Sequence, residues 1–563
     1  MGMRQGGSSL SGRPSASTAR GRPAGLPPGG AQATVRRVRR AVPLLVLLIG
    51  ARAEAIPLLD IRPGGSPFDG PTEEAPTAAF WNPAALGPLR GLHAWFSGSL
   101  ALERGSFDRA PFDNATGAVG SGASLPPTNL ASDRTGYLGA LSYDFGLDSF
   151  TLGIAVYEPW DTERSLADPK AAFSPAAAPA GYRLASENFR SLYVTVAAAL
   201  RVWSWLDLGV SLTPVDTWTD LTIYRDAALD GGSATVSQPN ALCGGRPCGY
   251  ENPMAAQRLQ LHGDGGSFWF GIPKPSGLGI GLGALLHFGR VHIGVSWTHV
   301  VPLPTDGSHY DRPYVSPSAI GASVTPAPGQ GAPCGSTING PLACVGGDAI
   351  SFAIPDVYHL GARIELRPGL ELAPWVRLVT YGGYDPYDDA SQGGLVLSLS
   401  GAPVTRANLP ERIVIAHGLR PSVTVELLGL RWKAMDRPRA GTLRVALSMV
   451  YQSPAVPSSY VDAAALDGHT LDATVGLEWR RAFGSRSRRP FALRLLAAAG
   501  VTGILPVDAS TSAYDPRARV ACVDSGYSID ACGADLLGTA SPTAAGRYTL
   551  VAPHFTAGAG FDW

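Results

Sequence analysis

The sequence predicts an all-β protein, a transmembrane antiparallel β-barrel of about fourteen strands. Apolar and polar residues alternate along many segments after residue 92, and the gaps between these segments are alternately short and long. Alternation with a period of two predicts strands with one apolar face. A soluble sandwich shows the same alternation, so the alternation alone does not decide. Short turns on one rim, long loops on the other and an even strand count are typical of bacterial outer-membrane barrels.

Fourteen segments carry the pattern. They cover residues 92–104, 135–145, 149–158, 188–202, 205–216, 277–288, 291–301, 349–367, 370–381, 409–433, 440–452, 469–482, 489–502 and 547–563. In the fifth segment, Leu208, Val210 and Leu212 alternate with glycine, serine and threonine, which suit a barrel lumen. Residues 409–433 are long enough for two strands, and 250–276 could hide another. Sixteen strands is therefore an open alternative.

The composition excludes several other classes of protein. Of the 563 residues, 45% are hydrophobic and 16% are charged, which is too apolar for a disordered chain. The formal net charge is zero, so the chain has no footprint for nucleic acid. The sequence contains no Gly-x-Ser-x-Gly, P-loop or His-Glu-x-x-His motif. We therefore expect no enzyme activity and no cofactor.

Residues 1–55 are expected to lie outside the fold. Residues 1–34, rich in Gly, Ser, Pro and Arg, are predicted to be a disordered extension, or else a stretch upstream of the true start codon that is not translated. Four arginines at positions 36–40, an apolar run at 41–50 and small residues ending at Ala55 follow, as in a secretory signal peptide. A transmembrane anchor needs about twenty apolar residues. We expect export, with cleavage after Ala55.

Six cysteines form three pairs that are close in sequence. These pairs are Cys243 with Cys248, Cys334 with Cys344, and Cys522 with Cys532. All three fall in predicted long loops on one rim. An exported chain meets an oxidising compartment, so the pairs predict three small-loop disulfides. A zinc site is the alternative, but the spacings do not match it.

The last predicted strand ends on an aromatic residue. Phe555, Phe561 and Trp563 lie on one face of this strand. Such an ending is expected to be recognised by the barrel-assembly machinery of the outer membrane. In the mature protein the apolar outer face is expected to contact outer-membrane lipid and lipopolysaccharide.

Four stretches together resemble the long-chain fatty-acid transporter family of outer-membrane proteins (FadL type). They are residues 80–86, 153–160, 354–356 with 367–370, and 546–563. The first contains Asn82, Pro83 and Ala84, similar to the family's segment between plug and first strand. The resemblance implies an N-terminal plug, or hatch, at residues 56–91 inside a barrel formed by 92–563. It also implies ligand-triggered plug movement and lateral exit of long-chain fatty acids or other hydrophobic compounds.

An apolar acid would be held by a groove with a few cations. Strand parity points Arg363, Arg377, Arg444 and Arg480 into the lumen. We favour Arg377 as a ligand contact because Trp375 shares its face. The alternative for each arginine is a lumen ion-pair ladder with Glu365, Glu371, Glu478 and Asp472.

Three histidines lie near one predicted hairpin, at positions 287, 292 and 299. Strand parity separates His287 from a site shared with the other two, so we expect no metal centre.

The predicted function is passive uptake of hydrophobic small molecules across the bacterial outer membrane through a plug-gated barrel. The alternative is a surface protein whose disulfide-tied loops, at 217–276 and 503–546, bind a partner or another cell. A lipid-hydrolysing enzyme is a third class, disfavoured because no nucleophile and base can be named.

Overall fold

The computed structural model describes the chain from residue 64 to residue 563, with gaps. The gaps are residues 114–117, 167–185, 227–238, 241–245, 248–255, 266–277, 301–302, 314–342, 353–355, 381–393, 399–411, 417–420, 439, 456–457, 459–460, 462, 464–465, 485–490 and 510–544. The predicted extension and signal peptide at 1–55 therefore lie outside the described residues. So do five of the six cysteines, while Cys344 is described only in its backbone.

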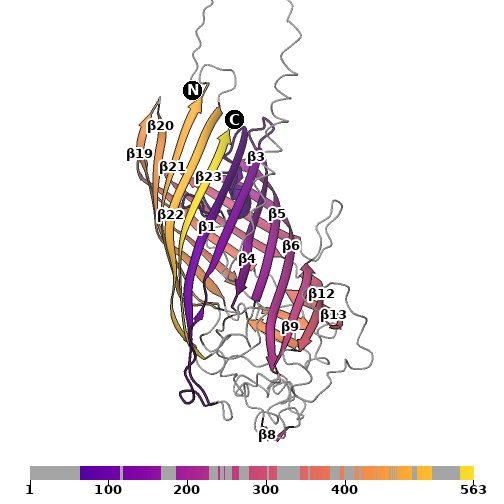
Figure 1. Cartoon of the computed structure of the whole chain (residues 1–563). Helices are drawn as coiled ribbons and strands as arrows, with labels where there is room; N and C mark the ends of the chain where they lie inside the picture. The colour runs from indigo at the N-terminus through magenta and orange to yellow at the C-terminus, as the bar shows by residue number, and fades with distance from the viewer. Residues whose placement is uncertain are drawn as a thin grey trace, which may run out of the picture. The chain divides into compact units, whose positions relative to one another are not determined.

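Fourteen strands pair in sequence order to form the wall of an antiparallel barrel (Figure 1). They are β1 (Leu92–Arg109), β3 (Ser132–Tyr143), β4 (Phe150–Ser165), β5 (Ser186–Trp203), β6 (Leu206–Asp226), β10 (Leu278–Phe288), β11 (Val291–Val300), β14 (Asp356–Arg367), β15 (Leu370–Leu372) with β16 (Trp375–Thr380), β19 (Ser422–Arg437), β20 (Gly441–Gln452), β21 (Thr470–Phe483), β22 (Phe491–Ala509) and β23 (Gly546–Asp562).

The ring closes where β1 pairs with β23, from His93 opposite Asp562 to Arg109 opposite Gly546. Closure leaves no open edge, as a lipid environment requires. The elements β15 and β16 count as one wall strand because both lie between β14 and β19. The all-β, fourteen-strand prediction is confirmed.

The two regions left open by the sequence, 250–276 and 409–433, each contain an extra strand, β9 (Ala256–Gly265) and β18 (Arg412–Ala416), but neither belongs to the ring. Six further described strands also lie outside the ring: β2 (Thr128–Asn129), β7 (Pro239–Asn240), β8 (Arg246–Pro247), β12 (Leu303–Pro313), β13 (Ala343–Phe352) and β17 (Gly394–Ser398). The first half of β6 pairs with β10, and its second half, from Trp218 on, pairs with β9 instead. From β9 the sheet continues through β12, β13, β17 and β18. The predicted strand 349–367 is thus two strands, β13 and β14, and 409–433 is β18 and β19. The wall has fourteen strands, not sixteen.

Short turns join most neighbouring wall strands at one rim. Gly289, in the turn between β10 and β11, has φ of 64°, and Gly369, between β14 and β15, has φ of 79°. This left-handed backbone suits tight hairpins and favours glycine.

The two faces of the wall differ in polarity, as the alternation predicts. On β6, Leu208, Val210 and Leu212 are exposed on the outside, whereas Asp207 and Thr213 are buried inside. Phe555, Phe561 and Trp563 also lie on the exposed face. An apolar exterior on a closed antiparallel barrel is the architecture of a bacterial outer-membrane protein. Among the described helices, none has the length and apolar character needed to cross a membrane.

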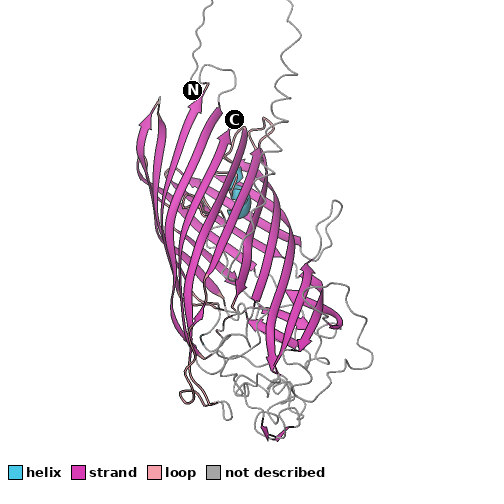
Figure 2. Ribbon diagram, viewed as in Figure 1, coloured by secondary structure: helices cyan, strands magenta, loops and turns pink. Residues whose placement is uncertain are grey.

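Residues 64–91, here called the inner segment, lie within the ring of strands. The segment contains two short helical turns, α2 (Ala78–Trp81) and η1 (Pro83–Leu86), drawn in cyan between the near and far strands in Figure 2. It is buried along most of its length. The turn η1 contacts β4, β5, β6, β10 and β11. The inner segment therefore forms much of the barrel's core.

Candidate functional site

The contact between the inner segment and the wall is centred on Asn82. Its side-chain nitrogen donates to the carbonyl oxygens of Pro71, at 2.9 Å, and Ala284 on β10, at 3.0 Å. Its side-chain oxygen accepts from the backbone N–H of Ala84 at 3.1 Å and caps η1. Pro83 occupies the first position of η1, where its missing N–H costs nothing. Asn82 thus stabilises the turn and holds it to the wall.

Glycines on the inner wall allow this close approach. Gly209 on β6 and Gly283 on β10 are cross-strand partners. A Cβ at Gly209 would overlap the backbone of Pro83 and Ala84, and one at Gly283 would overlap the side-chain oxygen of Asn82. The wall is therefore shaped to accept the Asn82-Pro83-Ala84 turn.

An ionic cluster centred on Glu73, which precedes Asn82 in the sequence, also holds the inner segment to the wall. Glu73 lies 2.7 Å from Arg431, 3.6 Å from Arg444 and 3.9 Å from Arg363, measured between carboxylate oxygens and guanidinium nitrogens. Burial alone would raise the pKa of Glu73, but the three arginines outweigh it and lower that pKa to about 2. Glu73 is therefore ionised at neutral pH and is the common partner of three wall cations.

Asp69 lies in a different electrostatic environment. Burial raises its pKa to about 7, against the hydrogen bond that it accepts from the Thr77 hydroxyl at 3.0 Å. The neighbouring charge of Glu73 adds to the rise. Near neutral pH this carboxyl is poised between its neutral and charged forms.

An aromatic cluster surrounds α2. Phe80 packs edge-on against Tyr157 of β4 at 4.8 Å between ring centroids, and Trp81 packs against Trp375 of β16 at 5.3 Å. His359 of β14 touches both, with its ring 5.9 Å from Phe80 and 5.2 Å from Trp81. These rings give the site an apolar, polarisable lining next to the segment.

The lumen arginines chosen from the sequence have different surroundings. Arg377 is 1% exposed, lies beside Trp375 on the inner face, and donates to the Thr424 hydroxyl at 3.4 Å. Arg363 pairs with Glu74 as well as Glu73. Arg444 pairs with Glu371 at 3.4 Å and Glu478 at 3.2 Å, the partners of the ion-pair alternative.

Sequence reasoning missed the partners that the inner segment contributes. Glu73 and Glu74 form an adjacent acidic pair in an otherwise mainly apolar stretch, and that contrast is a signal for buried cations nearby. Arg431 was also missed. It lies 358 positions from Glu73, and no local pattern links the two.

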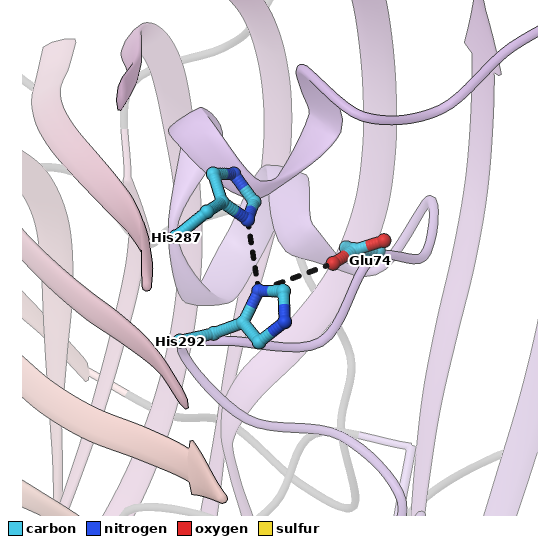
Figure 3. Close-up of side chains that lie close together, drawn as sticks. All are labelled: Glu74, His287 and His292. Carbon is cyan, nitrogen blue, oxygen red and sulfur yellow. Dashed lines mark hydrogen bonds and ion pairs between the residues drawn. The ribbon is translucent and has the colours of Figure 1, made fainter. Parts of the chain in front are cut away.

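The parity argument about the histidines was wrong. His287 and His292 are directly opposite each other in the β10–β11 hairpin. Residues paired across an antiparallel ladder share a face, whatever their separation in sequence. Their Nδ1 atoms are 2.8 Å apart, and His292 Nδ1 lies 3.7 Å from Glu74 (Figure 3).

No protein-family model matches the chain, and neither does any curated protein. Several solved structures do. A FadL homologue from Pseudomonas aeruginosa is 14% identical, with 91% of this chain and 99% of that chain covered, at a TM-score of 0.60. The toluene transporter TodX of Pseudomonas putida is 12% identical, with 90% and 99% covered, at a TM-score of 0.51. These likenesses, together with the closed fourteen-strand wall, show that the chain has the fold of the FadL-type outer-membrane barrels.

Proposed function

We propose that this protein is a passive outer-membrane channel for long-chain fatty acids or other hydrophobic small molecules. The observation that carries the proposal is the docking of the inner segment against the wall at Asn82 and Glu73. A segment held inside a closed barrel narrows the path along its axis. In this proposal residues 64–91 act as the plug, and the barrel begins at β1.

The lining near α2 supports an apolar ligand. Tyr157 and Trp375 pack against Phe80 and Trp81 of the docked segment, and in this proposal a hydrocarbon contacts these rings when the segment moves. Arg377 on the same wall would bind the carboxylate of a fatty acid, since guanidinium groups bind carboxylates with two donors. The shared fold with a toluene transporter makes a neutral aromatic compound the second ligand class.

Opening requires the segment to exchange its contacts for others. The Asn82 hydrogen bonds are neutral, whereas the Glu73 cluster is ionic and buried. Breaking a buried ion pair costs about 3–5 kcal/mol when one partner is left uncompensated. We therefore propose that opening begins at the Asn82 turn, while Glu73 keeps the segment attached.

The experiment compares uptake through the full barrel with uptake through a barrel lacking residues 64–80, both in outer-membrane vesicles. Labelled oleate and labelled toluene are the probes, and heat-dependent mobility on gels confirms that each barrel is folded. We expect the deletion to accelerate entry of both. Unchanged entry through a folded deletion variant would contradict the plug.

Ligand class is tested with Arg377→Gln. We expect slower oleate uptake and unchanged toluene uptake. Arg480→Gln is the matched control, because its side chain is half exposed and pairs with Asp562 at 2.8 Å. Equal loss of oleate uptake in both variants would argue against a carboxylate contact at Arg377. A lipid extract of the purified protein identifies any ligand that co-purifies.

A further inference from the structure

Three side chains from two parts of the chain converge where the inner segment passes the β10–β11 hairpin. Glu74 comes from the segment, and His287 and His292 come from the two strands (Figure 3). One carboxylate oxygen and one nitrogen from each ring all lie within 4.8 Å of one another. In the part of the chain that the structure describes, this is a group of potential metal ligands made of other residues than the Asn82 turn and the aromatic cluster.

The spacing of the three atoms suits a transition metal ion. Tetrahedral zinc, with bonds of about 2.0–2.1 Å to nitrogen and oxygen, needs ligand atoms roughly 3.3 Å apart. His292 Nδ1 is 3.7 Å from Glu74, and the two Nδ1 atoms are 2.8 Å apart. The two rings are nearly perpendicular, with 88° between their planes. The third pair of atoms, one from His287 and one from Glu74, lies within 4.8 Å, so small side-chain rotations would be needed to bring the three atoms to tetrahedral spacing.

A second layer of groups prepares His287 for ligation. Its Nε2 donates to a carboxylate oxygen of Asp207 at 2.6 Å. Asp207 is fully buried and is itself fixed by Arg201, whose Nε lies 2.9 Å from the other oxygen. A histidine that donates one ring N–H to a carboxylate presents the lone pair of its other nitrogen, as metal-ligating histidines do. Here that other nitrogen is Nδ1, which faces His292 and Glu74.

The cluster is also accessible to ions. The side chains of His287, His292 and Glu74 are 14%, 21% and 29% exposed. Arg363 pairs with Glu74 and so competes with a cation for its carboxylate. Asp207, 2.6 Å from His287, adds negative charge beside the cluster.

We propose that Glu74, His287 and His292 form a binding site for a divalent transition metal ion of the zinc class, joining the inner segment to the wall. Asp207 is a positioning residue that orients His287. The bound ion would add a link between residue 74 and the β10–β11 hairpin, independent of the Asn82 and Glu73 contacts. Three protein ligands leave one position for water.

Direct binding tests the site without any transport assay, so a negative result here leaves the proposed channel function standing. The untagged full-length barrel, treated with a chelator and dialysed, is titrated with Zn²⁺ by calorimetry and with Co²⁺ by visible absorption. We expect one equivalent and a tetrahedral Co²⁺ spectrum. His292→Ala and Glu74→Gln should each weaken binding by at least about ten-fold.

His299→Ala is the matched control, because His299 lies on the same strand and pairs with Asp356 at 2.6 Å, outside the cluster. Its metal affinity should equal that of the unaltered protein. Asp207→Asn should weaken Zn²⁺ binding about 10- to 100-fold. Glu74→Gln alters no wall residue, so it tests the site even if a histidine variant fails to fold. Binding that survives both Glu74→Gln and His292→Ala, or the lack of a stoichiometric site, would overturn the proposal.

Discussion

The side-chain nitrogen of Asn82 donates to the carbonyl oxygen of Ala284, 3.0 Å away, and so joins positions 202 residues apart. This bond connects the inner segment to β10 in the wall.

Replacing Asn82 with alanine should loosen the inner segment. The change removes the donor to Pro71 and Ala284 and the acceptor for Ala84 N–H. Each buried group left without a partner costs about 1–3 kcal/mol. Hydrogen exchange across residues 64–91 should accelerate, and exchange in β21 and β22 should not change. Asn82→Asp would place a buried carboxylate oxygen against the carbonyl oxygens of Pro71 and Ala284, so it should accelerate exchange at least as much as Asn82→Ala. An Asn82→Ala barrel with native protection in the segment would contradict the assigned role.

Adding a methyl group at Gly209 should displace the inner segment without disturbing the barrel. A Cβ there would overlap backbone atoms of Pro83 and Ala84, which cannot rotate away as a side chain can. We expect Gly209→Ala to expose the segment to added protease while the gel mobility stays that of a folded barrel. Gly98→Ala is the control, because its nearest neighbour would be a carbonyl oxygen at 3.7 Å. Equal protease resistance in the two variants would show that the close approach at Gly209 is not needed.

Docking of the inner segment should weaken as the pH rises from about 4 to about 7. The pKa of Asp69 is raised by burial from 3.8 to about 7, so the docked state keeps a proton that the undocked state releases in this range. The free energy of docking is therefore most favourable below pH 3.8, the usual pKa of an aspartate. It becomes less favourable as the pH rises and is constant again above about pH 7. Protection of residues 64–91, corrected for intrinsic exchange rates, measures this. Asp69→Asn should flatten the profile, and a slope that persists in this variant would assign the effect to another group.

Removing the charge of Glu73 should destabilise the docked inner segment more than removing the charge of Glu371, a less buried acid on the wall. Glu73→Gln leaves three arginines without their shared partner, and loss of one side of a buried pair costs about 3–5 kcal/mol. The pKa of Glu73 is lowered from 4.5 to about 2, so its contribution is complete above pH 4.5 and is lost as the pH falls through 2. Local opening energies from hydrogen exchange give the magnitude.

Glu371→Gln provides the comparison, since Glu371 is 29% exposed and lies 3.4 Å from Arg444. Its effect should be below about 1 kcal/mol, as for exposed pairs. The double change Glu73→Gln with Arg431→Met should recover part of the lost stability, because it also removes the buried arginine that Glu73→Gln leaves without its carboxylate partner. A smaller loss for Glu73→Gln than for Glu371→Gln would be inconsistent with the cluster.

The wall could be predicted from sequence because its rule is local. Alternation such as Leu208, Val210 and Leu212 follows from lipid on one side of a strand and the lumen on the other. The breaks that separate β13 from β14 and β18 from β19 do carry a signal, because Pro355, Gly418 and Pro421 lie at or beside them and such residues interrupt strands. The alternation of apolar and polar residues does not register these breaks. The alternation therefore predicted the fourteen wall strands but merged these pieces.

The contacts between the inner segment and the wall join residues that are far apart in the sequence, so no local pattern predicts them. Glu73 contacts Arg431 because the inner segment is docked inside the ring, and the two residues lie 358 positions apart in the sequence. His287 and His292 needed only the hairpin register, which a turn at residues 289 and 290 determines. The register was available in the sequence, whereas the long-range pairs were not.

The opposite charges of the inner segment and the wall have an electrical consequence. Arg363, Arg431 and Arg444 belong to the wall, whereas Glu73 belongs to the segment. A barrel lacking residues 64–80 keeps the three arginines but loses Glu73, which all three share, and Glu74, which also pairs with Arg363. Arg444 keeps its wall partners Glu371 and Glu478. Fixed cations in a pore favour the passage of anions. The deletion barrel is therefore expected to be more permeable to chloride, relative to potassium, than the intact protein. Loss of the inner segment would change the ionic selectivity of the pore as well as its width.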